Sequence, residues 1–269
     1  MYYYQKAYLA AAAACTLISP CLTSPVQPPI TNTSALPLHY GLVIFPHYQA
    51  LDIFGPMDLV NSLFMMYRNK TKEPHLSILS RTMDPVSSAM MSGGFGEAIL
   101  PTTTFKQYLS DHGPTNDTAS TSVDGKPDID VLIVPGGGGT RNDMSEEIAF
   151  IAAAFPRLKY IISICTGASL LSRAGVLQGR RATTNKRSWA WATSHGNNIT
   201  WVPTARWVQD GNVWSSSGVS AGIDAMYAFV GSVYGEDVAT FMSLNLEYTR
   251  ELHWDADPFA AVWDVPGAK

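Results

Sequence analysis

One cysteine in the middle of the chain, Cys165, stands where an isoleucine-rich stretch gives way to small residues. Residues 160–164 predict a buried strand, and Thr166 and Gly167 predict the start of a helix. A sharp strand-to-helix turn projects its turn residue, and the helix N-terminus offers unpaired N–H groups and a positive dipole. That environment lowers the pKa of a thiol and favours the thiolate. We therefore predict a nucleophile; an ordinary buried core cysteine is the alternative interpretation.

Asp52 is the second candidate for chemistry, because it begins a predicted helix soon after the first predicted strand. A carboxyl group placed between a developing thiolate and apolar walls has a raised pKa and can stay protonated. Such a group can deliver a proton to the carbon that a thiol attacks. From the residues alone, capping of a helix that begins at Ile53 is the favoured role of Asp52, and the chemical role is the alternative.

Four consecutive glycines, residues 136–139, follow the clearest predicted strand, residues 130–134. Glycines directly after a strand let the backbone approach a ligand closely. A merely flexible loop is the alternative interpretation. Asp224, near the start of a later predicted helix, is expected to cap or brace that helix rather than to act chemically.

The elements around these residues predict an α/β fold. Strands alternate with helices, which indicates a doubly wound, mostly parallel sheet with helices on both faces. Ligands bind such sheets at the carboxyl ends of the strands, where Asp52, the glycine run and Cys165 all lie. The predicted strands are residues 40–45, 75–79, 97–100, 130–134 and 160–164, with a hairpin over 207–214 that turns at Asp210 and Gly211. The predicted helices are residues 52–67, 145–155 with Ser145 as N-cap, 166–175, 221–233 and 236–252.

The composition narrows the class of protein. The chain has 269 residues, 46% of them hydrophobic and 15% charged, with a formal net charge of −4. Apart from one Arg-Arg pair, no basic run is present, so nucleic-acid binding is not expected. The histidines show no metal-ligand spacing, and we expect neither a metal nor a cofactor. Trp189, Trp191, Trp201, Trp207 and Trp214 are expected in the core or at its rim, with one or two lining an apolar substrate pocket.

The N-terminal residues predict export. Residues 1–24 have the layout of a signal peptide that is too short for a stable membrane anchor, and a Pro-rich linker follows over residues 25–38. The expected location is secreted or endomembrane, with a cytoplasmic protein that carries a poorly ordered tail as the alternative. Removal of the leader would take Cys15 and Cys21 and leave Cys165 as the sole thiol. The candidate glycosylation sites are Asn32, Asn69, Asn116 and Asn198.

Six ordered motifs together resemble the DJ-1/PfpI superfamily. They are residues 41–46 (GLVIFP), 51–56 (LDIFGP), 134–137 (VPGG), 164–167 (ICTG), 179–184 (GRRATT) and 216–224 (SSGVSAGID). The resemblance implies a flavodoxin-like fold over residues 39–252, with a tail over residues 253–269. It also implies a cysteine at a nucleophile elbow and a possible homodimer. Residues 51–56 with 164–167 look like the isonitrile hydratase branch, although the same pair occurs in the sensor domains of certain transcription regulators.

That branch implies a small-molecule enzyme that adds water to an isonitrile. Cys165 would attack the terminal carbon while Asp52 supplies the proton, which gives a thioimidate. Water would then release an N-substituted formamide. Backbone N–H groups of the Gly136 and Gly137 turn and of Thr166 would stabilise the charge on the added oxygen, and the Thr166 hydroxyl would orient the water.

Two positions depart from related sequences. Asn185 stands where bacterial relatives usually have histidine, which leaves the substrate open. Thr166 stands where the protease-like branch has histidine, which argues against peptidase activity. The alternatives are a glyoxalase-like enzyme for reactive aldehydes and a non-enzymatic ligand or redox sensor whose Cys165 is oxidised. A complete transcription regulator is not expected, because little chain follows residue 252.

Overall fold

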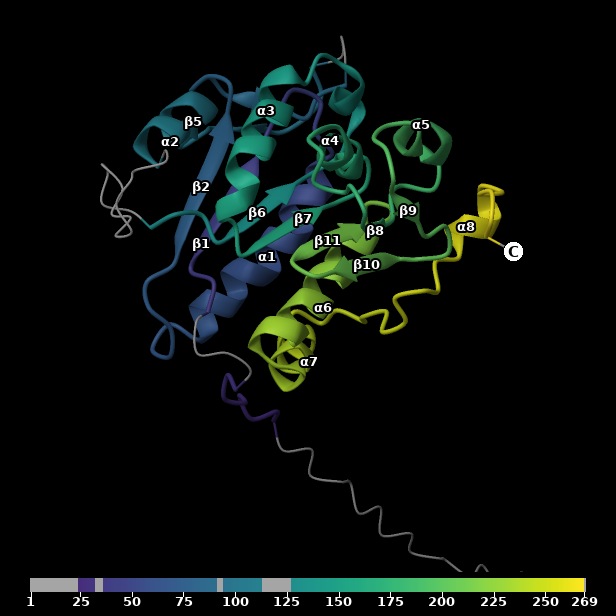
Figure 1. Cartoon of the computed structure of the whole chain (residues 1–269). Helices are drawn as coiled ribbons and strands as arrows, with labels where there is room; N and C mark the ends of the chain where they lie inside the picture. Colours follow the sequence, from purple (N-terminus) through teal and green to yellow (C-terminus); the bar gives the residue numbers. More distant parts are fainter. Residues whose placement is uncertain (1–23, 32–35, 91–93, 113–126, 269) are drawn as a thin grey trace, which may run out of the picture.

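The computed structural model describes residues 24–31, 36–90, 94–112 and 127–268. Its main sheet has seven strands in the order β10-β11-β7-β6-β1-β2-β5 (Figure 1). Neighbours pair in parallel except β10 with β11, which form an antiparallel hairpin at one edge. The strands are β1 His39–Val43, β2 His75–Ser80, β5 Thr103–Thr104, β6 Val131–Val134, β7 Tyr160–Ser163, β10 Trp207–Asp210 and β11 Val213–Ser216. The predicted mostly parallel sheet is confirmed.

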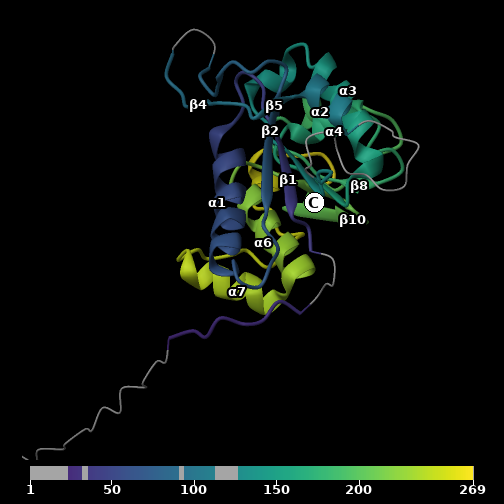
Figure 2. The same ribbon diagram turned by 90° about the vertical axis from the view of Figure 1, so that its left-hand side faces the viewer.

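Helices cover both faces of this sheet, as Figures 1 and 2 show. One face carries α1 Ala50–Met66, α6 Ala221–Tyr234 and α7 Glu236–Asn245, which pack against one another. The other carries α2 Phe105–Asp111, α3 Ser145–Ala154 and α4 Gly167–Arg173. The arrangement is the doubly wound, flavodoxin-like fold that the sequence predicts. Shorter elements complete it: β3 Val86–Ser87, β4 Ala98–Ile99, η1 Gly138–Arg141, η2 Phe155–Arg157, β8 Arg181–Ala182, α5 Trp189–Thr193, β9 Thr200–Trp201 and α8 Phe259–Val262.

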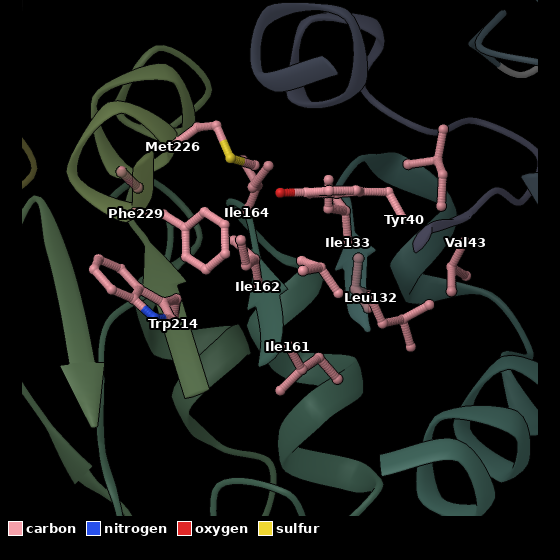
Figure 3. Close-up of a cluster of buried hydrophobic side chains, with 14 of the residues drawn as sticks. Tyr40, Val43, Leu132, Ile133, Ile161, Ile162, Ile164, Trp214, Met226 and Phe229 are labelled. Carbon is pink, nitrogen blue, oxygen red and sulfur yellow. The ribbon is translucent and has the colours of Figure 1, made fainter. Parts of the chain in front are cut away.

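The core lies between the central strands and the two helical layers. Every residue of β1, β6 and β11 is buried, as strands covered on both faces must be. Met226 and Phe229 of α6 point toward the end of β7, near Ile162 and Ile164 (Figure 3). The Phe229 ring meets the edge of Trp214 at 5.7 Å between centroids. This rigid packing fixes the ends of β6 and β7, from which the candidate site is built.

Two predicted details of the helices are wrong in the structure. Helix α3 begins at Ser145 with Met144 as its N-cap, because the Asp143 carboxylate accepts the Ser145 N–H from outside the helix. Helix α7 ends at Asn245 rather than near residue 252, and Glu247 has a left-handed φ of 51°. The predicted short strand over residues 97–100 is present as β4, which pairs with β3 outside the main sheet. The hairpin is confirmed, but its two turn residues are Gly211 and Asn212 rather than Asp210 and Gly211, because Asp210 pairs with Val213 inside the ladder.

Both ends of the described chain pack on the domain. The Tyr67 hydroxyl donates to the carbonyl of Pro28 at 2.9 Å, which holds the Pro-rich segment against the end of α1. At the other end, Asp257, Ala260 and Val265 are buried, so the described part of the expected tail belongs to the folded unit. The predicted leader up to residue 23 and the sequons at Asn32 and Asn116 lie outside the described residues. No helix within the described ranges is long and apolar enough to cross a membrane.

Candidate active site

Three neighbouring strands, β1, β6 and β7, deliver the predicted site residues to one edge of the sheet. The backbone of Tyr48, after β1, forms an antiparallel bridge with Gly137, after β6. The Gly136 N–H donates to Asp52 Oδ2 at 2.8 Å. The Gly137 N–H donates to Thr166 Oγ1, after β7, at 3.0 Å. The predicted convergence at the carboxyl ends of the strands is therefore present in the structure.

Cys165 occupies a strained turn between β7 and α4. Its φ is 57°, in the left-handed region that a residue with a side chain rarely adopts. The Thr184 hydroxyl donates to the Cys165 carbonyl at 2.9 Å and holds this conformation from a different part of the chain. A non-glycine residue held in this region by its surroundings is typical of functional sites. The geometry is that of the predicted nucleophile elbow.

The glycine run makes room for this turn. A Cβ atom on Gly136 would lie 2.5 Å from the Thr166 nitrogen and 3.0 Å from Cys165 Cβ. Gly137 has a φ of 132°, and a Cβ there would lie 2.4 Å from the carbonyl oxygen of His47. Close approach of three backbone segments explains these two glycines, so the interpretation as a merely flexible loop is wrong. Gly138 and Gly139 begin the short helix η1 instead.

The thiol of Cys165 does not have the lowered pKa that its position predicts. Burial raises the pKa well above its ordinary value of 9.0, and the nearby Asp52 carboxyl raises it further. Hydrogen bonds from Thr166 and Asn185 act in the opposite direction and are outweighed. Because the side chain is deeply buried, the loss of water at the sulfur exceeds the gain from the helix N-terminus. The resting thiol is therefore protonated and needs a base.

Asp52 lies beside this thiol and is fully buried, with no exposed area. Burial raises the pKa of its carboxyl from 3.8 to about 7, although the hydrogen bond from Gly136 opposes the rise. Its second oxygen, Oδ1, has no hydrogen-bond partner among the residues that the structure describes. Helix α1 begins at Ala50, before Asp52, so the predicted role as a cap is wrong. The predicted raised pKa of Asp52 is present, and near neutral pH this group can both accept and give a proton.

The Thr166 hydroxyl is held by the glycine turn. Its Oγ1 accepts the Gly137 N–H and lies 3.1 Å from the hydroxyl of Thr140. The predicted oxyanion roles of the Gly136 and Gly137 N–H groups are thus not met in this structure, because Gly136 already donates to Asp52 and Gly137 to Thr166. The Thr166 backbone N–H points at the sulfur instead and favours the thiolate form. Thr166 acts here on the thiol and on the loop that borders it.

Asn185 contacts the sulfur of Cys165, and the sequence does not predict this contact. Its Nδ2 donates to Cys165 Sγ at 3.2 Å, and its Oδ1 accepts the Ser188 N–H at 2.9 Å. The second bond fixes which end of the amide faces the sulfur. Asn185, which stands where related sequences have histidine, therefore contacts the nucleophile itself. The spacing of Asn185 from Cys165 gives no sign of this contact, and only the resemblance marked the position.

A cavity of about 440 Å³ opens in front of the thiol. Cys165 and Thr166 line it, whereas the buried Asp52 is not among its lining residues. The loop after β6, the segment after β8 and the turn between β11 and α6 form its sides. The lining residues are Gln49, Gly137, Gly138, Arg141, Cys165, Thr166, Asn185, Lys186, Arg187, Ser188, Arg206, Ser217, Gly218, Val219, Ser220, Ala221, Phe259 and Trp263.

The C-terminal segment forms one wall of this cavity through Phe259 and Trp263. The sequence predicts five other tryptophans as candidates for an apolar substrate pocket, and none of them lines this cavity. The segment is held by a buried contact between Lys186 Nζ and Asp257 Oδ2 at 3.7 Å. Burial lowers the pKa of Lys186 to about 8, and Asp257 partly offsets this. A wall built from residues so late in the chain explains why sequence patterns near Cys165 do not reveal it.

Asp224 has the bracing role that the sequence predicts. Its Oδ2 pairs with Arg206 at 2.7 Å, and its Oδ1 accepts the Tyr248 hydroxyl at 2.9 Å and the Glu251 N–H at 3.0 Å. These bonds tie α6 to the chain that leads into the C-terminal wall. Among the described residues, no group of three or more His, Cys, Asp or Glu side chains could hold a metal ion.

The sequence also matches known proteins. The DJ-1/PfpI family pattern matches residues 42–232. An isonitrile hydratase from Pseudomonas putida is 31% identical over 221 residues, which cover 81% of this chain and 82% of that protein. The HTH-type transcriptional regulator GbdR of Pseudomonas aeruginosa is 28% identical over 134 residues, 49% of this chain and only 36% of the regulator.

Solved structures show the same fold. A ThiJ/PfpI family protein from Pseudomonas syringae superposes with a TM-score of 0.61 at 25% identity, over 87% of this chain and 84% of that one. DJ-1beta of Drosophila melanogaster superposes with a TM-score of 0.60 at 18% identity, over 80% of this chain and all of its own. Because the family pattern matches residues 42–232 and the elbow cysteine, the glycine turn and the doubly wound sheet are all present, the chain belongs to the DJ-1/PfpI family.

Proposed function

We propose that the protein is a cofactor-independent hydratase that converts a small isonitrile to an N-substituted formamide. One observation carries the proposal: the Cys165 thiol lines a cavity, and near it lies the buried Asp52 carboxyl group, whose pKa burial raises to about 7. The similarity to the P. putida isonitrile hydratase, which extends over four-fifths of both chains, supports the same chemistry.

The first step forms the covalent intermediate. The Asp52 carboxylate takes the proton of the Cys165 thiol, and the sulfur attacks the terminal carbon of R–N≡C. The protonated Asp52 then returns the proton to that carbon, which gives the thioimidate Cys165–S–CH=N–R. The raised pKa of Asp52 suits both transfers, because a group with a pKa of about 7 exchanges protons readily at neutral pH.

The second step consumes water. Water adds to the thioimidate carbon, the nitrogen gains a proton, and the C–S bond breaks to release R–NH–CHO. The departing sulfur is stabilised by the Asn185 amide and the Thr166 N–H, which already donate to it in the resting protein. The thiol then regains its proton, so the sum is one isonitrile and one water to one formamide.

Turnover of cyclohexyl isocyanide by pure protein, followed by NMR, tests the proposal. Wild type should form the formamide, while Cys165→Ala and Asp52→Asn should lose nearly all of the rate. Asp58→Asn removes an exposed carboxylate elsewhere on α1 and is the matched control, which should retain activity. Absence of formamide with wild-type protein over a panel of small isonitriles would overturn the proposal.

A ligand sensor is the second candidate, and the GbdR similarity favours it. In that case the cavity would bind a ligand without turnover. Ready oxidation of Cys165 to a sulfenic acid, together with no isonitrile hydration, would favour a redox sensor. The buried, protonated thiol argues against rapid oxidation, because oxidants react with the thiolate.

We also propose export and a homodimer. The sequons at Asn69 and Asn198 both lie on exposed side chains, where glycosylation is sterically possible. Intact-mass measurement of protein from a eukaryotic host tests cleavage of the leader and glycan occupancy together. The homodimer rests on the family resemblance, and sedimentation velocity tests it.

A further inference from the structure

The cavity in front of Cys165 carries an uncompensated positive charge. Four cationic side chains line it, whereas no Asp or Glu is among its described lining residues. The charges of two of the four are neutralised by carboxylates that do not line the cavity: Arg206 pairs with Asp224, and Lys186 pairs with Asp257. The chain as a whole has a net charge of −4, so this local excess runs against the overall balance.

Arg141 and Arg187 are the two cations without such a partner. Neither has a carboxylate within ion-pair distance among the residues that the structure describes. Both lie at one side of the cavity, because Arg141 donates to the hydroxyl of Ser188, the residue next to Arg187, at 3.3 Å. The site therefore presents two guanidinium groups to whatever enters.

Aromatic rings hold both guanidinium groups. The Arg141 guanidinium lies 4.1 Å from the ring centre of Trp191, and that of Arg187 lies 5.6 Å from the ring centre of Trp263. A guanidinium on a ring keeps its N–H groups for other partners and loses less conformational freedom on binding an anion. The planar fork of N–H donors fits a carboxylate in a bidentate manner.

We propose that the substrate is an electrophile that carries a carboxylate, which Arg141 and Arg187 hold while its reacting carbon faces Cys165. Phe259, Trp263 and Val219 offer apolar surface for the rest of the molecule. The inference rests on the proposed function and makes its substrate class specific: an isonitrile with a carboxylate on its substituent, rather than a neutral one.

Alkylation of Cys165 tests charge selection without any isonitrile. Iodoacetate and iodoacetamide differ in charge and little in size, so the ratio of their rates at Cys165, relative to the same ratio for glutathione, reports the local field. Because both reagents share one thiol, the ratio cancels changes in thiol pKa and access. Peptide mass spectrometry reads the two products at Cys165.

Wild type should favour iodoacetate relative to glutathione, and this preference should fall as salt is raised. Arg141→Gln and Arg187→Gln should each lower it by about 2- to 5-fold, as expected for exposed charges. Arg68→Gln removes an exposed arginine outside this cavity and should leave the ratio unchanged. A wild-type ratio equal to that of glutathione, or an equal change in all three variants, would overturn the inference.

Kinetics with isocyanoacetate and its ethyl ester complete the test. Preference for the carboxylate in kcat/KM, lost in the two arginine variants, is the expected result. Hydration of the ester with no preference for the acid would overturn the inference and leave the proposed function intact. Hydration of neither would overturn the proposed function, while the alkylation ratio would still decide whether the cavity selects anions.

Discussion

The contact between Asn185 and the sulfur gives the sharpest test of how this site controls its thiol. The Asn185 amide is the one side chain from outside the elbow that donates to Sγ in the described structure, at 3.2 Å. Hydrogen bonds to a charged group contribute about 1.5–3 kcal/mol. Since the bond favours the thiolate, its removal should raise the pKa of the Cys165 thiol further and lower the thiolate fraction at any pH below it.

The size of the effect on reactivity follows from two opposed factors. A loss of about 1.5–3 kcal/mol lowers the thiolate fraction by roughly 10- to 150-fold. A more basic thiolate is a better nucleophile, and a Brønsted coefficient of about 0.4–0.5 restores close to half of this on a logarithmic scale. The net expectation for Asn185→Ala is a fall of about 4- to 15-fold in the rate of alkylation by iodoacetamide between about pH 7 and 9.

The second bond of Asn185 requires a matched variant. Asn185→Ala also removes the acceptor for the Ser188 N–H and can loosen the loop. Asn185→Asp keeps that acceptor, loses the donor to sulfur and places a negative charge beside it. If the donor matters, Asp should slow alkylation at least as much as Ala. Alkylation of Asn185→Asp at the wild-type rate would refute the reasoning and assign Asn185 to loop structure alone.

Two further predictions concern Asp52 and Gly136, which are connected by a hydrogen bond next to the thiol. The pKa of Asp52 is raised in the folded state, so the protonated form stabilises the fold and this contribution is lost as the pH rises through about 7. Urea titrations should show wild type losing up to roughly 1.4 kcal/mol per pH unit relative to Asp52→Asn from about pH 5 to 7, and parallel curves would contradict the assignment. Gly136→Ala should lower the free energy of unfolding by about 1–3 kcal/mol, because its Cβ would press on Thr166 and Cys165. Among the described residues, a Cβ at Gly138 would approach the flexible end of Met90 alone, so Gly138→Ala should unfold like wild type. Thermal melts of the two variants and the wild type check both expectations.

Much of the fold is predictable because its signals are local. The apolar strands β1, β6 and β7 and the small residues after Cys165 each predict an element without information from elsewhere in the chain. The two predictions of helix ends that fail also have local causes. Asp143 displaces Ser145 from the cap of α3 through a side chain outside the periodic pattern, and α7 ends where Glu247 turns left-handed.

The residues of the candidate site also divide into those that local sequence signals predict and those that they do not. Asp52, the glycine turn and Cys165 are predictable together, because the carboxyl ends of adjacent parallel strands must meet. The cavity walls are not: Arg187 follows a short strand, β8, and Trp263 comes from the C-terminal segment. Their positions depend on long-range contacts such as Lys186 with Asp257, which no spacing in the sequence encodes.

The thiol itself shows why position and environment must be weighed separately. An elbow at a helix N-terminus favours the thiolate, yet burial beside Asp52 outweighs that effect and leaves the sulfur protonated. A resting thiol of this kind is poorly reactive toward general oxidants, so its chemistry depends on a substrate that lets Asp52 take the proton. For a protein proposed to work in an oxidising compartment, where a free thiolate is exposed to disulfide exchange, such masking is a physical advantage. The raised pKa therefore supports an enzyme activated by its substrate over a constitutive redox sensor.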